Sequence, residues 1–228
     1  MIHNPLGSRY AIGGALGRSI KRAASGYTTW YTLDGEITPI IAYQAKGAAN
    51  LAASYVNLIT PGTLDAGVGN APDWDATNGW KLTAASSHYL STGLPYFLTN
   101  TRDTIIKWSN ASAGCAFGGI GANGYRNYWM KPVDGGYMKW GYANSIVSNY
   151  TQQSSGVFAL ANDNVYLNGV DIGNIGVVSG GLGNFPIGAY SNNGTIQDYF
   201  TGYIQAFAVY ADITAEQVVK LIDAMNAL

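Results

Sequence analysis

The sequence predicts an all-β protein, a two-sheet antiparallel sandwich preceded by an extended arm and closed by a C-terminal helix. Three observations predict this class. The chain of 228 residues holds 30 Gly, 17 Tyr and 6 Trp, but only 12 Lys and Arg and 13 Asp and Glu, a composition typical of short strands and tight turns. Asn168-Gly169 separates two apolar runs, which predicts a hairpin. From Gly183 onward, the apolar period changes from that of strands to that of a helix.

The first 26 residues are basic and form the predicted arm. They contain Arg9, Arg18, Lys21 and Arg22 and no acid, so their charge is +4, whereas the remainder holds 8 basic and 13 acidic side chains and carries −5. This segment has too little apolar surface to fold alone. We expect it to be an assembly arm that contacts neighbouring subunits. A cleaved secretory signal fits less well, because glycines interrupt its apolar stretch and basic residues follow it.

Residues 27–63 are predicted to form a lead-in that contains one short helix. The stretch Ala42–Leu58 is rich in alanine, and Ala48, Leu51 and Tyr55 follow helical spacing. Pro61-Gly62 then ends the helix, and a loop rich in glycine and aspartate follows.

Residues 64–228 carry the strand signals of the sandwich. The expected strands begin at Gly79–Leu82 and Tyr89, continue at Thr104–Trp108, and recur as short strands through the glycine-rich segment Gly114–Gly141. The hairpin at Val165–Ile172 follows, since Asn-Gly supplies the positive φ angles of a type I′ turn.

The C-terminal segment predicts a central strand and then a surface helix. From Phe200 to Tyr210 the run is apolar on both sides, as a central strand requires. Simple alternation places Tyr203, Phe207 and Val209 on one face and Ile204, Ala206 and Tyr210 on the other. In residues 212–228, Thr214 and Gln217 fit a capping box, and Val218, Leu221, Ile222, Met225 and Leu228 follow helical spacing.

Three of these segments resemble the laminin G-like, concanavalin A-like jelly roll: Asp75–Leu90, Val165–Gly169, and Phe200–Tyr210 with the helix after it. Phe200, Gly202, Ile204, Tyr210 and Thr214 match the Phe-x-Gly-x-Ile strand, closing aromatic and helix start of that family. The resemblance covers about residues 64–228. It implies two antiparallel sheets packed face to face, and recognition of glycans or proteins by loops or by a concave sheet face. With its lead-in Ala42–Pro61, the chain also resembles structural proteins of tailed bacteriophages.

Aromatic side chains are the expected ligand contacts, because flat rings with polar edges suit sugar faces and protein partners. The candidates crowd the middle of the chain and are Tyr125, Tyr128, Trp129, Tyr137, Trp140 and Tyr142. Core packing competes for the same rings, so we expect only some of them to face solvent.

The sequence argues against catalysis. Glycosidases on this kind of sandwich resemble one another in a Glu-x-Asp-x-x-Glu strand, whereas this chain has only Glu36, in the lead-in, and Glu216, in the last helix. Asp73 with Asp75 is the nearest carboxylate pair, but such pairs are common in exposed loops. His88 is the sole histidine outside the arm, no Gly-x-Ser-x-Gly motif occurs, and the lone Cys115 fits a small buried residue.

Cofactor and metal motifs are weak. Gly119–Gly124 matches Gly-x-Gly-x-x-Gly, but the residues after it are typical of a strand rather than the helix that holds a pyrophosphate. Asp65, Asp73 and Asp75 form the nearest acidic group for a loop calcium, and turn-forming aspartates explain them better. No cofactor and no metal are predicted. Nucleic acid binding by the acidic body is disfavoured, and no run reaches the length of a membrane span.

These observations favour a non-enzymatic structural or attachment module of a virion or other extracellular surface assembly. A freestanding carbohydrate-binding lectin is the first alternative. An enzyme acting on glycosides with the same fold is the second.

Overall fold

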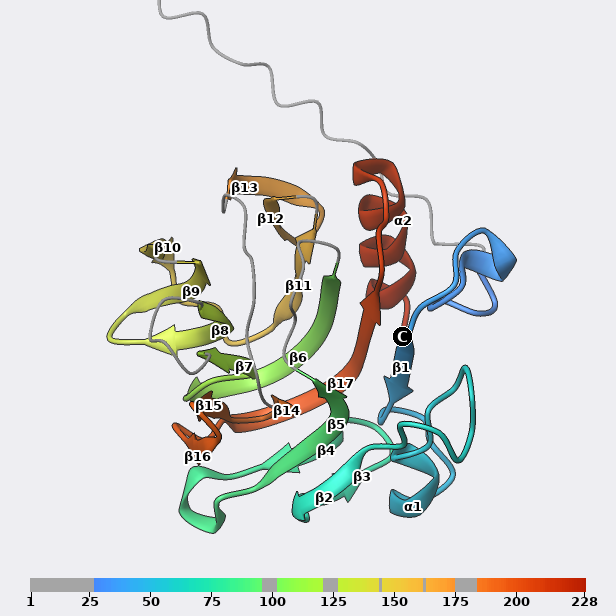
Figure 1. Ribbon diagram of the computed structural model, residues 1–228, viewed down its shortest axis with the longest axis horizontal. Helices are drawn as coiled ribbons and strands as arrows, with labels where there is room; N and C mark the ends of the chain where they lie inside the picture. The colour runs from blue at the N-terminus through green and yellow to red at the C-terminus, as the bar shows by residue number, and fades with distance from the viewer. Residues whose placement is uncertain (1–26, 96–101, 121–126, 144, 162, 175–183) are drawn as a thin grey trace, which may run out of the picture.

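The computed structural model describes residues 27–95, 102–120, 127–143, 145–161, 163–174 and 184–228, which form two β-sheets packed face to face (Figure 1). Pairing within the sheets is antiparallel, apart from a short parallel contact between two strands. The predicted two-sheet antiparallel sandwich is therefore confirmed. The predicted arm with Arg9, Arg18, Lys21 and Arg22 lies outside the described residues.

One sheet, here called sheet A, has the strand order β13-β12-β11-β6-β17-β4-β3, with β1 also paired to β17. Its strands are β1 (Ile41–Gln44), β3 (Asp73–Asp75), β4 (Gly79–Leu82), β6 (Asp103–Ala113), β11 (Gly156–Ala161), β12 (Asn164–Leu167), β13 (Val170–Asn174) and β17 (Thr201–Tyr210).

The other sheet, sheet B, has the order β10-β9-β8-β7-β14-β5-β2, with β15 and β16 attached beside β7. Its strands are β2 (Gly67–Asn70), β5 (Tyr89–Pro95), β7 (Phe117–Ile120), β8 (Asn127–Asp134), β9 (Tyr137–Ala143), β10 (Ser145–Thr151), β14 (Asn184–Ile187), β15 (Tyr190–Asn192) and β16 (Thr195–Gln197). The helices are α1 (Leu51–Ser54) and α2 (Ala215–Asn226), with single 3-10 turns η1 (Leu33–Gly35) and η2 (Ala84–Ser86).

Strand β17 is central in sheet A, as its two apolar faces predict. One edge of β17 pairs with β6 along most of its length. Its other edge pairs first with β4, at Gly202–Ile204, and then with β1, at Ala206–Val209. The lead-in therefore supplies a strand of the sandwich. The apolar run at Ile41, in the predicted lead-in, thus belongs to sheet A.

A β-bulge at Gln205 corrects the predicted faces of β17. The register shifts between Ile204 and Ala206, so Ile204 joins Phe207 and Val209 in the core between the sheets. Simple alternation had placed Ile204 on the opposite face, and the extra residue of the bulge reverses that assignment.

The core between the sheets is rich in large aromatic side chains. Trp80, Trp108, Trp140, Phe117, Phe158, Phe185 and Phe207 are all at most 1% exposed. Phe117 is surrounded by other rings, including Phe185 with its centroid 5.6 Å away. Most of the tryptophan and phenylalanine that the sequence offers is thus used to fill this layer.

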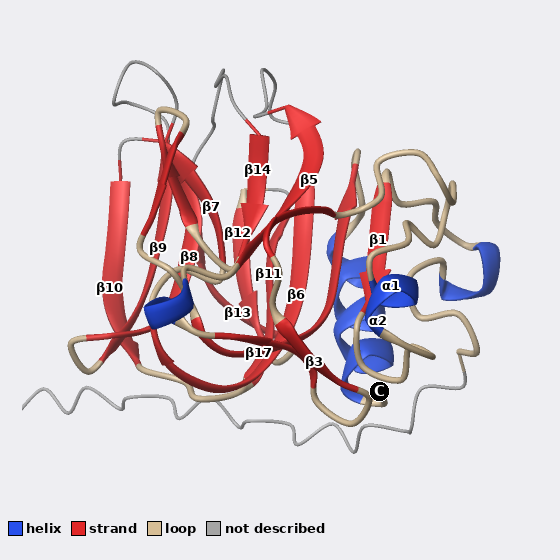
Figure 2. Cartoon of the chain, turned by 90° about the horizontal axis from the view of Figure 1, so that it is seen from below, coloured by secondary structure: helices blue, strands red, loops and turns tan. Residues whose placement is uncertain are grey.

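A second core lies on the outer face of sheet A, where α2 packs (Figure 2). Val218, Leu221, Ile222 and Met225 are buried there, as their helical spacing predicts. The Thr214 side chain accepts a hydrogen bond from the Gln217 amide, and the Gln217 side chain accepts one from the Thr214 amide, so the predicted capping box is confirmed. No helix in the described part of the chain is long and apolar enough to cross a membrane.

The lead-in also packs on this outer face. Trp30, Leu33 and Ile37 are buried in the same cluster as the apolar side of α2. The Lys220 ammonium of α2 joins the lead-in to the helix, because it lies 3.0 Å from a Glu36 carboxylate oxygen and 3.1 Å from one of Glu216. The two glutamates of the chain are thus held in surface ion pairs.

Two local predictions have different outcomes. Asn168 and Gly169 have φ angles of 51° and 83°, and the strands on either side pair, so the predicted hairpin is confirmed. The predicted lead-in helix is only the four residues of α1, because β1 takes the beginning of the alanine-rich stretch. Asn50 caps α1 by accepting a hydrogen bond from the Ala53 amide at 2.9 Å.

Candidate functional site: a polar pocket beside β1

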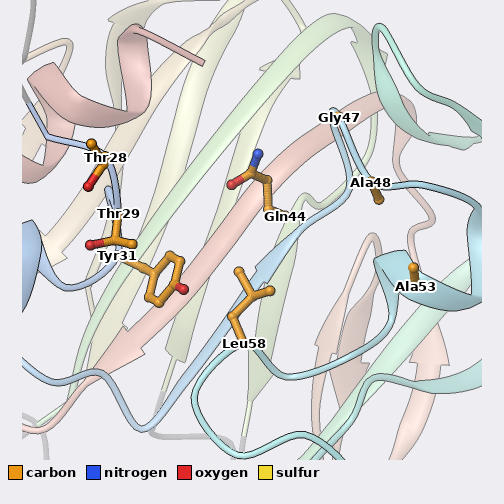
Figure 3. A pocket seen from close by; sticks show the side chains of 8 residues that line it. All are labelled: Thr28, Thr29, Tyr31, Gln44, Gly47, Ala48, Ala53 and Leu58. Atoms are coloured by element: carbon orange, nitrogen blue, oxygen red, sulfur yellow. The ribbon is translucent and has the colours of Figure 1, made fainter.

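A pocket of about 410 Å³ opens on the side of sheet A where the lead-in, β1 and α1 meet. Its lining residues are Thr28, Thr29, Tyr31, Gln44, Gly47, Ala48, Ala53 and Leu58. Figure 3 shows the Tyr31 ring, the Gln44 carboxamide and the Leu58 side chain around one shared space, with Gly47 and Ala48 across from the threonines. Every lining residue comes from the lead-in, a segment in which the sequence analysis predicted no ligand site.

The threonine wall of the pocket is held in place by Asp34. This residue has a left-handed backbone, with φ 56°, which Asp tolerates better than most side chains. Its Oδ1 accepts hydrogen bonds from the amide and hydroxyl of Thr28 at 3.0 and 2.9 Å, and from the amide and hydroxyl of Thr29, both at 2.9 Å. These donors, the Thr29 amide foremost, lower the pKa of the Asp34 carboxyl. The Thr29 hydroxyl oxygen also accepts a hydrogen bond from the Thr32 hydroxyl at 2.8 Å, so it keeps one lone pair for a ligand, and the Thr28 oxygen keeps two.

The carboxamide of Gln44 is fixed at both of its ends. Its Oε1 accepts a hydrogen bond from the Trp30 indole at 2.8 Å, and its Nε2 donates one to the Lys46 carbonyl at 3.0 Å. One N–H and one oxygen lone pair remain unused by these contacts. Gln44 therefore presents one donor and one acceptor to the pocket in an orientation that is already set.

Tyr31 supplies the aromatic wall. Its ring is nearly perpendicular to that of Trp30, with the centroids 5.6 Å apart, and its backbone carbonyl accepts a hydrogen bond from the Tyr210 hydroxyl at 3.0 Å. Trp30 is buried, whereas Tyr31 is partly exposed. The partly exposed Tyr31 side chain thus lines the pocket while its backbone is anchored to the central strand β17.

Asn57 ties the opposite side of the pocket to β1. Its buried carboxamide accepts a hydrogen bond from the Ala42 amide at 3.2 Å and donates to the Thr60 hydroxyl and the Thr63 carbonyl, both at 3.0 Å. The neighbouring Leu58 amide donates to the Ala42 carbonyl at 2.9 Å. The pocket-lining Leu58 is therefore held close to the strand that carries Gln44.

The chemistry of this lining suits binding rather than bond cleavage. It presents hydroxyl groups, one carboxamide, one phenol ring and small apolar side chains, and Tyr31 is its single ionisable side chain. Acid–base catalysis needs a group that titrates close to the working pH. Hydroxyl, amide and ring contacts are what a neutral polar ligand such as a sugar requires.

Three of the six aromatic side chains predicted as ligand contacts are buried in the fold. Tyr128, Trp129 and Trp140 are 5%, 5% and 1% exposed, so their rings offer no free face to a ligand. Tyr128 and Trp140 point into the core between the sheets. Tyr137 alone of the described rings in that set is well exposed, at 51%. Tyr125 and the side chain of Tyr142 lie outside what the structure describes.

Trp129 is buried on the outer face of sheet B rather than in the core. The Lys131 ammonium lies 5.4 Å from its ring centroid, and the Tyr190 ring meets it edge-on at 6.1 Å. Lys131 also forms ion pairs with Asp198 and Asp134. This tryptophan therefore serves as a platform for the protein's own side chains.

The aspartates considered as calcium ligands make other contacts: Asp65 and Asp75 accept backbone hydrogen bonds in turns, and Asp73 forms an ion pair. Asp65 accepts hydrogen bonds from the Asn57 and Gly62 amides at 2.8 and 3.1 Å, and Asp75 accepts from the Thr77 amide at 2.7 Å. Asp73 lies 3.8 Å from the Lys81 ammonium. Within the described ranges, no three His, Cys, Asp or Glu side chains gather as metal ligands would.

The remaining candidates from the sequence also have structural contacts. His88 faces the Thr83 hydroxyl at 3.5 Å, and Cys115 is fully buried. Of the glycine motif Gly119–Gly124, the first two residues end β7, and the next described residue, Asn127, begins β8. The first residues described after the motif thus form a strand, whereas the dinucleotide motif is followed by a helix.

Comparisons with known proteins indicate the fold and no family. No known protein family matches the chain, and no curated protein sequence does either. A Trypanosoma rangeli sialidase in complex with the inhibitor DANA superposes with a TM-score of 0.58 at 15% identity, over 82% of this chain and 32% of that chain. A mutant of that sialidase displaying trans-sialidase activity gives a TM-score of 0.54 at 14% identity, over 82% and 33%.

A smaller carbohydrate-binding module is also similar. The CBM40 module of the Ruminococcus gnavus IT-sialidase, bound to alpha2,3 sialyllactose, matches at 16% identity and a TM-score of 0.40, over 54% of this chain and 83% of that one. This chain spans about a third of the length of the trypanosomal sialidases. At such identities, the likeness to the two sialidases shows a shared β-sandwich fold.

Proposed function

We propose that this chain is a non-catalytic carbohydrate-binding domain, and that the pocket beside β1 receives part of a glycan. The observation that carries the proposal is the lining itself, which combines the Tyr31 ring and the fixed Gln44 carboxamide with the threonine hydroxyls and contains no carboxylate. Its volume of about 410 Å³ falls in the range of about 300 to 1,000 Å³ that is usual for small-ligand sites.

The preset geometry of the polar groups supports binding without rearrangement. Trp30 and Lys46 hold the Gln44 carboxamide, and Asp34 holds Thr28 and Thr29. A ligand that uses these groups does not have to order them first, so less of its interaction energy is lost on binding.

A glycan array followed by calorimetry on the full chain tests the proposal. Tyr31→Ala is expected to weaken binding of the best glycan by about 10-fold, because an aromatic ring in the wall of a pocket is a typical dominant contact. Gln44→Leu, which keeps the size of the side chain, is expected to weaken it by a similar factor. Tyr137→Ala removes an exposed ring from the opposite sheet and is the matched control.

Two results would contradict the proposal. Equal affinities for wild type, Tyr31→Ala and Gln44→Leu would remove the pocket from the binding site. If mass spectrometry detects a shortened glycan after a long incubation with the protein, the chain is an enzyme acting on glycosides instead.

Attachment within a virion or another extracellular surface assembly stays a finer proposal. Its support is the charge asymmetry, +4 in residues 1–26 against −5 in the remainder. Light scattering on the full chain and on a chain starting at Gly26 tests the arm: a freestanding lectin predicts monomers in both cases, and an assembly arm predicts larger species for the full chain only.

A further inference from the structure

Lys107 lies on the same face of sheet A as the pocket. Gln44 of β1 is directly opposite Ala206 of β17, and Ala206 is directly opposite Lys107 of β6. Directly opposed residues of antiparallel strands point to the same side, and neighbouring strands are about 4.8 Å apart. The backbone of Lys107 therefore lies about 10 Å from that of the pocket residue Gln44, and the fully buried Ala206 lies between them in the sheet.

Lys46 is fixed at the rim of the pocket by its backbone. Its amide donates to the Gln205 carbonyl at 3.0 Å, and the amide of Ala45 donates to the same oxygen at 2.9 Å. Its own carbonyl accepts the Gln44 Nε2 hydrogen bond, and the next residue, Gly47, lines the pocket. The bulge in β17 thus anchors the start of the Lys46 side chain.

These two lysines differ from the other lysines that the structure describes. The other four each pair with a carboxylate, and they are Lys81, Lys131, Lys139 and Lys220. Lys46 and Lys107 have no carboxylate within ion-pair distance among the described residues. The Lys107 ammonium instead donates to the carbonyls of Met225 and Asn226 at 2.8 and 3.3 Å, at the C-terminal end of α2.

The positive charges of Lys46 and Lys107 repel each other, and no carboxylate of the described residues compensates them. Lys107 is half-buried, and burial first and the nearby positive charge of Lys46 second lower the pKa of Lys107 to about 8. The carbonyls at the end of α2 offset part of this cost. A negative group placed between the two ammonium groups would remove their mutual repulsion and gain two charge-assisted contacts.

The geometry points to Lys46 and Lys107 as a subsite for an anionic group, so that the preferred ligand is an acidic glycan carrying a carboxylate or a sulfate. The inference rests on the proposed function, because the neutral part of the same glycan would occupy the pocket. The inference specifies that the ligand carries a negative charge, which the pocket lining alone does not indicate.

Matched pairs of glycans test the subsite. The array carries each acidic glycan beside its neutral parent: glucuronides beside glucosides, sulfated galactosides beside galactosides, and sialyllactose beside lactose. Wild-type protein is expected to bind at least one acidic member about 5-fold or more tightly than its parent, with an advantage that shrinks as salt rises. Comparing the carboxylate and sulfate pairs then shows which anion is preferred.

Lys46→Gln is the diagnostic variant, and Lys139→Gln is its control. Both remove one positive charge from a partly exposed lysine, but Lys139 lies in sheet B and pairs with Asp134. Lys46→Gln is expected to reduce the ratio of acidic to neutral affinity by about 5-fold, and Lys139→Gln is expected to leave this ratio unchanged.

The outcomes separate the two proposals. If neutral glycans bind with dependence on Tyr31 and acidic glycans bind no better, the anionic subsite is wrong and the carbohydrate-binding function stands. If no glycan of either kind binds, both fail. Equal effects of Lys46→Gln and Lys139→Gln would also overturn the subsite, since a general charge effect would then explain the preference.

A second readout does not depend on affinity. The Nζ resonance of Lys107, titrated by NMR, is expected to move toward a higher pKa in the Lys46→Gln variant and when the acidic glycan is bound. A bound acidic glycan that leaves the Lys107 titration unchanged would contradict the subsite.

Discussion

The hydroxyl of Tyr210, near the end of the central strand β17, donates a hydrogen bond of 3.0 Å to the backbone carbonyl of Tyr31, 179 residues earlier in the chain. The Tyr210 side chain is fully buried in the outer core of sheet A. This contact connects the pocket wall to the most constrained strand of the sandwich.

Tyr210→Phe is therefore expected to lower the free energy of unfolding by about 1 kcal/mol, since one carbonyl loses its partner while the ring still packs. Chemical denaturation followed by tryptophan fluorescence measures this change. Tyr137→Phe, at an exposed ring, is the control and is expected to change stability by less than about 0.5 kcal/mol. Equal stabilities of both variants would show that the Tyr31 segment is not held through this bond.

Gly118 allows β7 and β8 to approach closely. Its φ is +102°, and a Cβ at this position would lie 1.9 Å from the Tyr128 carbonyl oxygen. Gly118→Ala is expected to destabilise the protein by more than about 3 kcal/mol or to prevent folding, because the backbone of β8 would have to move. Gly135→Ala is the matched control, with φ +62° and no atom within 4 Å of its added Cβ, and is expected to cost only about 1 kcal/mol. Similar melting temperatures for the two variants would contradict the strand packing described for β7.

Acidification is expected to release the threonine wall of the pocket. Hydrogen bonds lower the folded-state pKa of Asp34 below its ordinary value of 3.8. The stabilisation from its carboxylate is therefore fully present above pH 3.8 and is lost as the pH falls through the lower, folded-state pKa. The amide resonances of Thr28 and Thr29 should follow this titration in NMR spectra, and Asp34→Asn should abolish it. A midpoint at or above 3.8 would show that the carboxylate is not held by these donors.

The thiol of Cys115 is expected to be inert in the folded protein. It is fully buried and donates a hydrogen bond to the Phe117 carbonyl at 3.0 Å. Burial, and then the negative charge of Asp198, raise its pKa well above the ordinary value, so the reactive thiolate is absent near neutral pH. A thiol reagent should modify this single cysteine only as denaturant unfolds the chain, in step with the loss of tryptophan burial. Fast labelling without denaturant would contradict the placement of Cys115.

Elements determined by local chemistry were predictable from the sequence. The hairpin turn at Asn168-Gly169 and the capping box at Thr214 depend on residues close together in the chain, so their signals are complete within a few positions. The apolar double face of Phe200–Tyr210 likewise indicated a central strand.

Features that depend on pairing were not predictable from one sequence. Strand β1 was missed because Ile41–Gln44 adjoins an alanine-rich stretch that favours a helix, although the two isoleucines at Ile40 and Ile41 are a β-type signal. The predicted face of Ile204 was wrong because a bulge shifts the strand register and the apolar pattern of the sequence does not indicate it.

The pocket was missed for a similar reason. Tyr31 and Gln44 are unremarkable by sequence, and they face one space only because β1 adds to the edge of β17. The sequence also could not separate the buried Tyr128 from the exposed Tyr137, since the choice between core and surface for such rings depends on strand register.

The position of β1 also determines how much of the N-terminal part can be removed before the sandwich exposes an open strand edge. A chain that begins at residue 64 would lack β1, so half of one β17 edge, from Ala206 to Val209, would have unsatisfied amides and carbonyls. It would also lack Trp30 and Leu33, which cover apolar surface beside α2. An open, apolar strand edge invites addition of a strand from another molecule. We therefore expect this shortened protein to aggregate even though all its other strands are present.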